Sequence, residues 1–140
     1  MVDKDTPQLI NLARRFFHPV MADLERMSTV SGMMEFIMPM AKAFGRLQQA
    51  TLYLAKAGTA NPDDAGASAT EYLRMFGLVA IGYMWCRMAE VAMAKEDSFH
   101  RGKVDCAKFF MAKILPETGS LLATISAGSA PVMALAEDGF

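Results

Sequence analysis

The stretch YLRMFGLVAIGYMWCRMA, residues 72–89, decides the fold class of this chain. Arg74 and Arg87 are its only charged residues, and the run between them is almost wholly apolar. A helix that is apolar on nearly every side is usually central in its fold or shared with a second surface. Two seams at helical spacing run along it, one made of Leu73, Gly77, Ala80, Met84, Met88 and Val91, the other of Tyr72, Met75, Val79 and Cys86.

Working outward from this stretch, three further helices are predicted. The first begins at Thr6-Pro7, the second covers about residues 33–57 and the fourth begins after Asp97 or Ser98. The central helix is expected from about Pro62, with Asn61 as its cap, to Lys95. No alternating strand pattern occurs. Short connections between four helices favour an all-α, antiparallel up-down-up-down four-helix bundle.

Three prolines fall inside these predicted helices, and each is expected to bend its helix: Pro19, Pro39 and Pro116. Glycines 77 and 82 cost helix stability, about 1 kcal/mol each relative to alanine, which a close approach of a neighbouring backbone would explain. Residues on the regular seams are expected to form the core, and we predict burial of Ile37, Phe44, Leu47, Leu73, Ala80, Met84, Met111 and Ile114.

Length and composition limit the functional classes. The 140 residues suit a single domain spanning 1–140, with a tail at 129–140. Fourteen basic and fifteen acidic residues leave a net charge of −1, which argues against nucleic-acid binding. The run between Arg74 and Arg87 is shorter than the roughly 20 apolar residues that cross a bilayer, so a membrane role is not favoured. The N-terminus lacks the apolar stretch of a signal peptide, and we expect a cytoplasmic protein.

Residues with chemical potential are few and dispersed. His18 and His100 lie far apart, outside any metal-binding spacing, and the two cysteines, Cys86 and Cys106, are expected on different helices. No phosphate-binding loop or nucleophile motif occurs. We therefore expect no catalytic, cofactor-binding or metal site.

Charged and aromatic residues of the central helix suggest pairing and binding instead. Glu71 with Arg74, and Arg87 with Glu90, have the spacing of surface ion pairs. Core packing is the simpler interpretation of the rings on this helix, although tyrosine and tryptophan are also enriched at interfaces. The residues retained as a possible interface are Tyr72, Tyr83, Trp85 and Arg87.

Three segments carry a resemblance to a known family: residues 44–51 (FGRLQQAT), residues 72–89, and residues 109–119 (FFMAKILPETG) running on to 133–135. Together they resemble the acetyl-CoA dehydrogenase C-terminal-like domain. This domain follows the FAD-binding and first helical domains in acyl-CoA dehydrogenases similar to the 3-methylmercaptopropionyl-CoA enzyme. The resemblance is strongest from Arg46 to Leu135.

The resemblance implies that the FAD site, the acyl-CoA pocket and the catalytic glutamate belong to earlier domains. The chain would then be no enzyme by itself, but a module for domain packing or oligomer assembly. Its expected partners are a second copy or the catalytic domains of an acyl-CoA dehydrogenase. This hypothesis predicts an exposed apolar patch around the central helix.

Two alternatives are kept beside it. A stand-alone bundle binding a small apolar or acyl ligand would need an enclosed pocket of roughly 300 Å³ or more. A peripheral membrane role would turn the apolar segments and nearby lysines toward lipid.

Overall fold

The computed structural model describes residues 6–135 and Gly139, with side chains from residue 11 onward. Every regular element in this part is helical, which confirms the all-α prediction. The elements are α1 (Thr6–Ser28), α2 (Met34–Ala60), α3 (Pro62–Ala67), α4 (Ala69–Met93), α5 (Ser98–Phe109), a π-helical turn (Phe110–Ile114), α6 (Glu117–Ser126) and α7 (Ala130–Met133).

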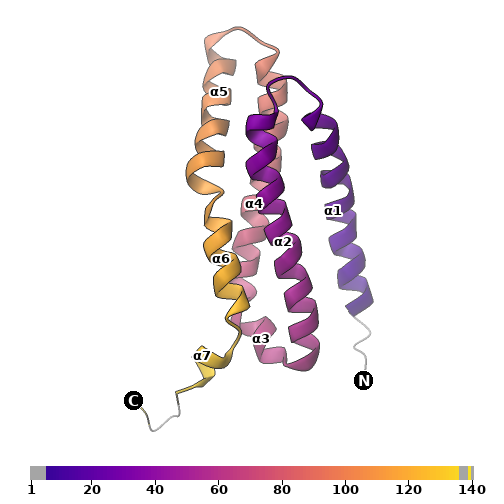
Figure 1. Cartoon of the computed structure of the whole chain (residues 1–140), viewed down its shortest axis with the longest axis vertical. Coiled ribbons are helices and arrows are strands. Elements are labelled where there is room, and N and C mark those ends of the chain that lie inside the picture. The colour runs from indigo at the N-terminus through magenta and orange to yellow at the C-terminus, as the bar shows by residue number, and fades with distance from the viewer. Residues whose placement is uncertain (1–5, 136–138, 140) are drawn as a thin grey trace.

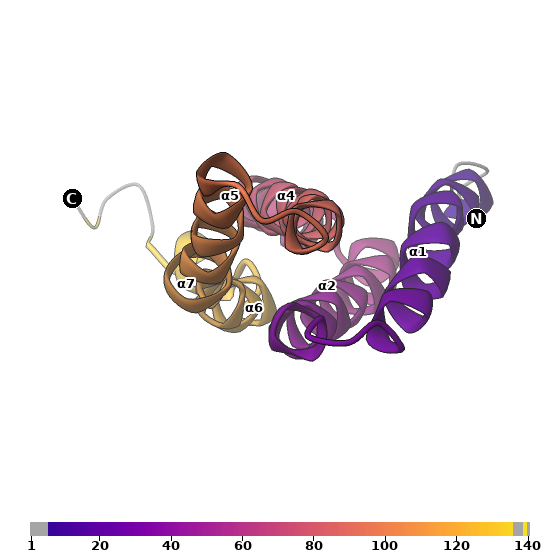
Figure 2. The same ribbon diagram turned by 90° about the horizontal axis from the view of Figure 1, so that it is seen from above.

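The long segments α1, α2, α4 and α5–α6 lie side by side along the long axis, and the chain reverses direction between them (Figure 1). α2 and α4 pack against each other and against α5 and α6. α1 stands at one side, mainly against α2 (Figure 2). Because α2 covers only one side of α4, the opposite side of α4 is left between α1 and α5 without a covering helix (Figure 2).

The core follows the predicted seam of α2. Ile37, Phe44 and Leu47 are buried, as predicted from their alternating four- and three-residue steps. Met111 is also buried, again as predicted. The buried residues of all the packed helices form one continuous cluster, as expected for a single core.

The choice between the two seams of α4 was wrong. Leu73 is 73% exposed and Met84 46%, and Ala80 is only half-buried. The second seam forms the core instead, with Met75, Val79 and Cys86 fully buried. Periodicity finds apolar faces but does not rank them, and both faces of this helix are apolar.

Small residues explain why the inner face is the buried one. A Cβ atom at Gly82 would lie 2.9 Å from the sulfur of Met40, 3.3 Å from Leu115 and 3.4 Å from Phe110. Gly82 thus closely approaches neighbouring side chains, and not a backbone as predicted. Gly77 has no atom within 4 Å of such a Cβ, so no close approach explains it.

The predicted fourth helix is divided into three pieces. The Leu115 N–H donates to the Phe110 carbonyl at 2.9 Å, which closes a π-helical turn. The wider turn shifts the side chains that follow, so Leu115 is buried and Ile114 is exposed, contrary to prediction. Pro116 then caps α6, whereas Pro19 and Pro39 lie inside helices that continue on both sides.

Helix ends agree with the predicted caps. The Asn61 side chain accepts from the Asp63 N–H at 3.1 Å, and Asp97 accepts from the His100 N–H at 3.0 Å. The predicted third helix is interrupted at Ser68, a buried residue whose hydroxyl donates to the Ile125 carbonyl at 3.3 Å. In the tail, α7 forms one turn, but Val132, Met133 and Leu135 remain exposed.

Candidate interaction surface on helix α4

An exposed apolar row runs along the uncovered side of α4, as the proposed packing role predicted. We call it the outer strip, and it consists of Leu73, Gly77, Ile81, Met84, Met88 and Val91. Its five large side chains are between 41% and 73% exposed. The strip extends over about 27 Å at 1.5 Å per residue. Single exposed apolar residues are ordinary, whereas contiguous apolar patches are typical of protein, membrane or ligand contacts, which makes this row a candidate surface.

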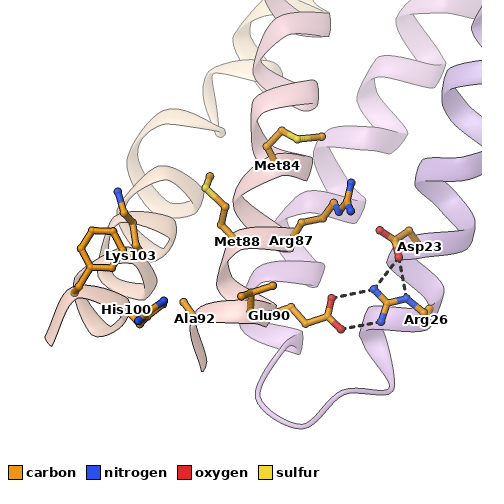
Figure 3. A pocket seen from close by; sticks show the side chains of 11 residues that line it. Asp23, Arg26, Met84, Arg87, Met88, Glu90, Ala92, His100 and Lys103 are labelled. Atoms are coloured by element: carbon orange, nitrogen blue, oxygen red, sulfur yellow. Dashed lines mark hydrogen bonds and ion pairs between the residues drawn. The ribbon is translucent and has the colours of Figure 1, made fainter. Parts of the chain in front are cut away.

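One end of the outer strip forms a groove of about 560 Å³ (Figure 3). Met84, Met88 and Val91 provide apolar walls, and Phe99 of α5 adds an aromatic ring. Charged residues from three helices surround these walls: Asp23 and Arg26 of α1, Arg87 and Glu90 of α4, and His100 and Lys103 of α5. The groove is open to solvent, because the apolar residues that line it are themselves exposed.

A polar cluster ties α1 to α4 beside this groove (Figure 3). Arg26 donates from Nη1 and Nη2 to both oxygens of Glu90, at 2.7 and 2.9 Å, and from Nε to Asp23 at 2.9 Å. The Tyr83 hydroxyl donates to Asp23 Oδ2 at 2.7 Å. Two planar charged groups joined by two hydrogen bonds fix orientation as well as distance. The cluster therefore sets how α1 stands beside α4.

The hydrogen bonds of this cluster shift its ionisation equilibria. The hydrogen bond from Tyr83 is the largest influence on Asp23, and together with Arg26 it lowers the pKa of that carboxyl. The hydrogen bond from Arg26 lowers the pKa of Glu90. Burial, followed by the hydrogen bond to Asp23, raises the pKa of Tyr83. Both carboxylates are thus held in their charged forms.

The predicted ion pairs within α4 are replaced by pairs between helices. Glu90 pairs with Arg26 of α1 and not with Arg87. Arg74 pairs with Glu117 of α6, at 2.7 Å from Nη2 to Oε2, and not with Glu71. The two arginine–carboxylate pairs between helices have a two-point geometry that an i,i+3 pair within α4 does not offer. Sequence spacing alone could not reveal those partners.

Two cationic side chains at the rim of the groove lie close to aromatic rings. The guanidinium of Arg87 lies 5.9 Å from the centroid of the Tyr83 ring, and the Lys103 ammonium lies 5.1 Å from that of Phe99. Neither takes part in an ion pair within the described part of the chain. The groove therefore presents apolar walls with positive charge at its edge.

The residues predicted as a possible interface are divided between the core side and the exposed side of α4. Tyr72 bonds the Thr51 hydroxyl at 2.7 Å, and the Trp85 ring lies 6.4 Å from that of Phe110. Both rings, and that of Tyr83, are half-buried against the core. Arg87 is exposed beside the outer strip. The seam read from the sequence omitted Ile81, and Leu73 was predicted to be buried. The presence of two apolar seams on one helix nevertheless indicated a second surface.

The two cysteines do not line the groove, whereas His100 does. Cys86 lies in the core, and burial raises the pKa of its thiol to about 12. Cys106 is exposed on α5. Nδ1 of His100 lies 2.6 Å from Oδ2 of Asp97, the residue that caps the start of α5.

Within the described residues, α4 alone is long and apolar enough to cross a membrane by length and composition, with a mean hydropathy of 1.2 over 18 residues. Its inner side forms the core, and ion pairs join it to α1 and α6. Core helices of soluble proteins that pass this test are mostly buried, whereas 39% of the apolar window is buried here. The hydropathy of α4 thus reflects its two apolar faces.

Comparison with known proteins identifies the family of the chain. No curated protein matches it. The family model described as acetyl-CoA dehydrogenase C-terminal like matches residues 16–136, from the middle of α1 past the end of α7. The match includes the whole of α4 with its outer strip. The chain belongs to the acetyl-CoA dehydrogenase C-terminal-like family.

Proposed function

We propose that this chain is a non-catalytic helical module of an acyl-CoA dehydrogenase assembly, acting in domain packing or in oligomer assembly. Family membership supports the link to these flavoenzymes. The module would be an antiparallel four-helix bundle with proline-bent helices, cytoplasmic like its expected partners. The parent enzyme we favour is one similar to the 3-methylmercaptopropionyl-CoA dehydrogenase.

The outer strip of α4 is the observation that carries this proposal. Inner-face residues such as Met75 and Val79 already supply the contacts that α4 needs for its own fold. The five large apolar side chains on the opposite face add nothing to this core, and leaving them in water is unfavourable by roughly 25 cal/mol per Å² of apolar area. A second protein surface would remove that area from water.

The charges beside the outer strip indicate what this partner surface carries. Arg87 and Lys103 stand at the edge of the groove without ion-pair partners among the described residues. Acidic side chains around an apolar centre would complement them and steer association. The partners we propose are therefore a second copy or the catalytic domains of the dehydrogenase, and not nucleic acid or membrane.

The described residues do not fit a flavin. A dinucleotide's phosphates are usually held by a glycine-rich turn that leads into a helix N-terminus. The two positive-φ glycines here, Gly32 and Gly128, stand singly in the short connections before α2 and α7, and neither belongs to a glycine-rich turn. At the start of α7 the Ser129 N–H already donates to Asp64 at 2.8 Å. We propose that FAD is bound by other domains of the assembly.

Size-exclusion chromatography with light scattering tests the proposal. The chain is run alone and with the FAD-bearing portion of the dehydrogenase as a separate polypeptide. A stable complex or a homo-oligomer is expected, and the double variant Ile81→Asp/Met84→Asp should abolish it. Leu52→Asp is the matched control, because Leu52 is equally apolar and exposed but lies on α2. A wild-type chain that stays monomeric and ignores the dehydrogenase portion would refute the role.

A second candidate function uses the groove at the end of the outer strip. Its volume of about 560 Å³ exceeds the roughly 300 Å³ of a small-ligand site, and its cationic rim would suit the carboxylate of a fatty acid. It is open, however, whereas ligand sites usually bury most of the ligand surface. Titration with dodecanoate, followed by isothermal calorimetry, should give no saturable heat if the groove is a protein-docking surface.

A further inference from the structure

We propose that the outer strip binds a second copy of this chain, with the two α4 helices antiparallel about a twofold axis between Ile81 and Met84. This inference rests on the proposed function and specifies its partner. Twofold dimers are the commonest oligomers, and they require a surface that is complementary to itself. A twofold contact therefore requires the outer strip to match its own reversed copy.

Spacing provides the first match. Gly77, Ile81, Met84, Met88 and Val91 follow alternating four- and three-residue steps, the pattern of helices that pack at a small angle. When the strip is reversed about the point between Ile81 and Met84, the three steps from Gly77 to Met88 each meet their equivalents, and Val91 falls at the level of Arg74. Ile81 then lies opposite Met84 of the second copy, and Gly77 lies opposite its Met88.

Size provides the second match. Gly77 lowers the stability of α4 relative to alanine, yet a Cβ atom there would meet nothing within 4 Å in this chain. The space above it is open on the outer strip. Met88 is a long, flexible side chain of the kind that fills irregular gaps. In the reversed register Met88 of the second copy enters that space, whereas parallel helices would set Gly77 against Gly77 and leave a void.

Charge provides the third match. A parallel pair would bring Arg87 against Arg87, but reversal places Arg87 at the level of Leu78 of the second copy. The reversed register thus keeps the two Arg87 side chains apart.

The length of the strip matches the width of a standard dimer interface. An interface of standard size covers about 800 Å² per partner, a patch roughly 30 Å across. The outer strip extends over about 27 Å. Exposed side chains on both flanking helices, Met21 of α1 and Phe99 of α5, would widen it. α4 has no covering helix on this side (Figure 2), which leaves room for the second copy's α4.

Light scattering of the chain alone tests the stoichiometry. A mass of twice 15.3 kDa is expected at micromolar concentration. Met84→Asp should weaken the dimer at least tenfold, and Leu52→Asp should not. Far-UV circular dichroism of each variant checks that the helices are retained, since Met84 lies outside the core.

Cross-linking tests the register. Gly77→Cys and Met88→Cys variants are made with Cys106→Ser, which removes the exposed thiol; buried Cys86 stays unreactive. With a short bifunctional maleimide, a mixture of the two variants should form a covalent dimer at least tenfold faster than either variant alone. Equal cross-linking by each variant alone would indicate parallel helices and overturn the register.

The outcomes separate this inference from the proposed function. A monomeric chain that joins the dehydrogenase portion through the outer strip would overturn the second-copy proposal and leave the packing role intact. A monomeric chain that ignores that portion would overturn both.

Discussion

Two glycines of α4 provide a matched test of the packing. Gly77→Ala and Gly82→Ala add the same methyl group to the same helix, five residues apart. Alanine is favoured over glycine in a helix interior by about 0.8–1 kcal/mol. At Gly77 the new methyl meets nothing within 4 Å, so the monomer should be stabilised by about 0.5–1 kcal/mol.

At Gly82 the same methyl would lie 2.9 Å from the sulfur of Met40 and 3.3 Å from Leu115. Met40 and Leu115 are both buried, so neither has free space to move into. Overpacking of a filled core costs about 1–3 kcal/mol. When the gain in helix propensity is subtracted, Gly82→Ala should destabilise the chain by between about zero and 2 kcal/mol. Because both variants share that gain, Gly82→Ala should be about 1–3 kcal/mol less stable than Gly77→Ala.

Urea denaturation followed by circular dichroism measures both changes. Protein concentration is kept low enough for light scattering to show monomer, so that any effect of Gly77→Ala on self-association does not enter. If Gly82→Ala stabilised the chain as much as Gly77→Ala does, the close packing of α4 against Met40 and Leu115 would be refuted.

The remaining predictions concern the two faces of α4 and the cluster beside it. Val79→Ala should cost about 1–3 kcal/mol of stability and Val91→Ala less than about 0.5, because Val79 is fully buried and Val91 is 61% exposed; equal losses in urea denaturation would contradict the assignment of faces. Asp23→Asn should destabilise the chain at pH 6 but progressively less toward pH 2. The folded-state pKa of Asp23 lies below its ordinary value of 3.8, so the stability that its carboxylate contributes is present above that value and lost as pH falls through the folded-state pKa. A difference in unfolding free energy between variant and wild type that stays constant down to pH 2 would contradict this prediction. The chain should stay in the soluble fraction when floated with anionic vesicles, and comigration would show that the apolarity of α4 serves a membrane.

A helix with two apolar faces reconciles the family assignment with the exposed surface. The inner face of α4 carries small residues, Gly82, Cys86, Ala89 and Ala92, which let α2 and α5 approach closely. The outer strip carries longer side chains, which suit contact with a separate surface. In the role that we propose, the module folds through one face of α4 and assembles through the other.

Several features were determined by the sequence alone. Helical spacing without any strand pattern predicted the all-α fold, and the regular seam of α2 predicted the burial of Ile37, Phe44 and Leu47. Asn61 and Asp97 were predictable caps, because a cap is a local interaction between residues two or three positions apart. The resemblance of three segments also pointed to the family that the comparison identified.

Tertiary structure decided which face of α4 is buried, which helices its charges join, and where the fourth helix widens into a π-turn. Both seams of α4 have the periodicity of a core face, and the choice between them depends on the shape of neighbours such as Met40, which lies far away in the sequence. The partner of Glu90 depended in the same way on where α1 came to lie. Local patterns report the spacing of apolar and charged groups, but only packing determines which of them meet.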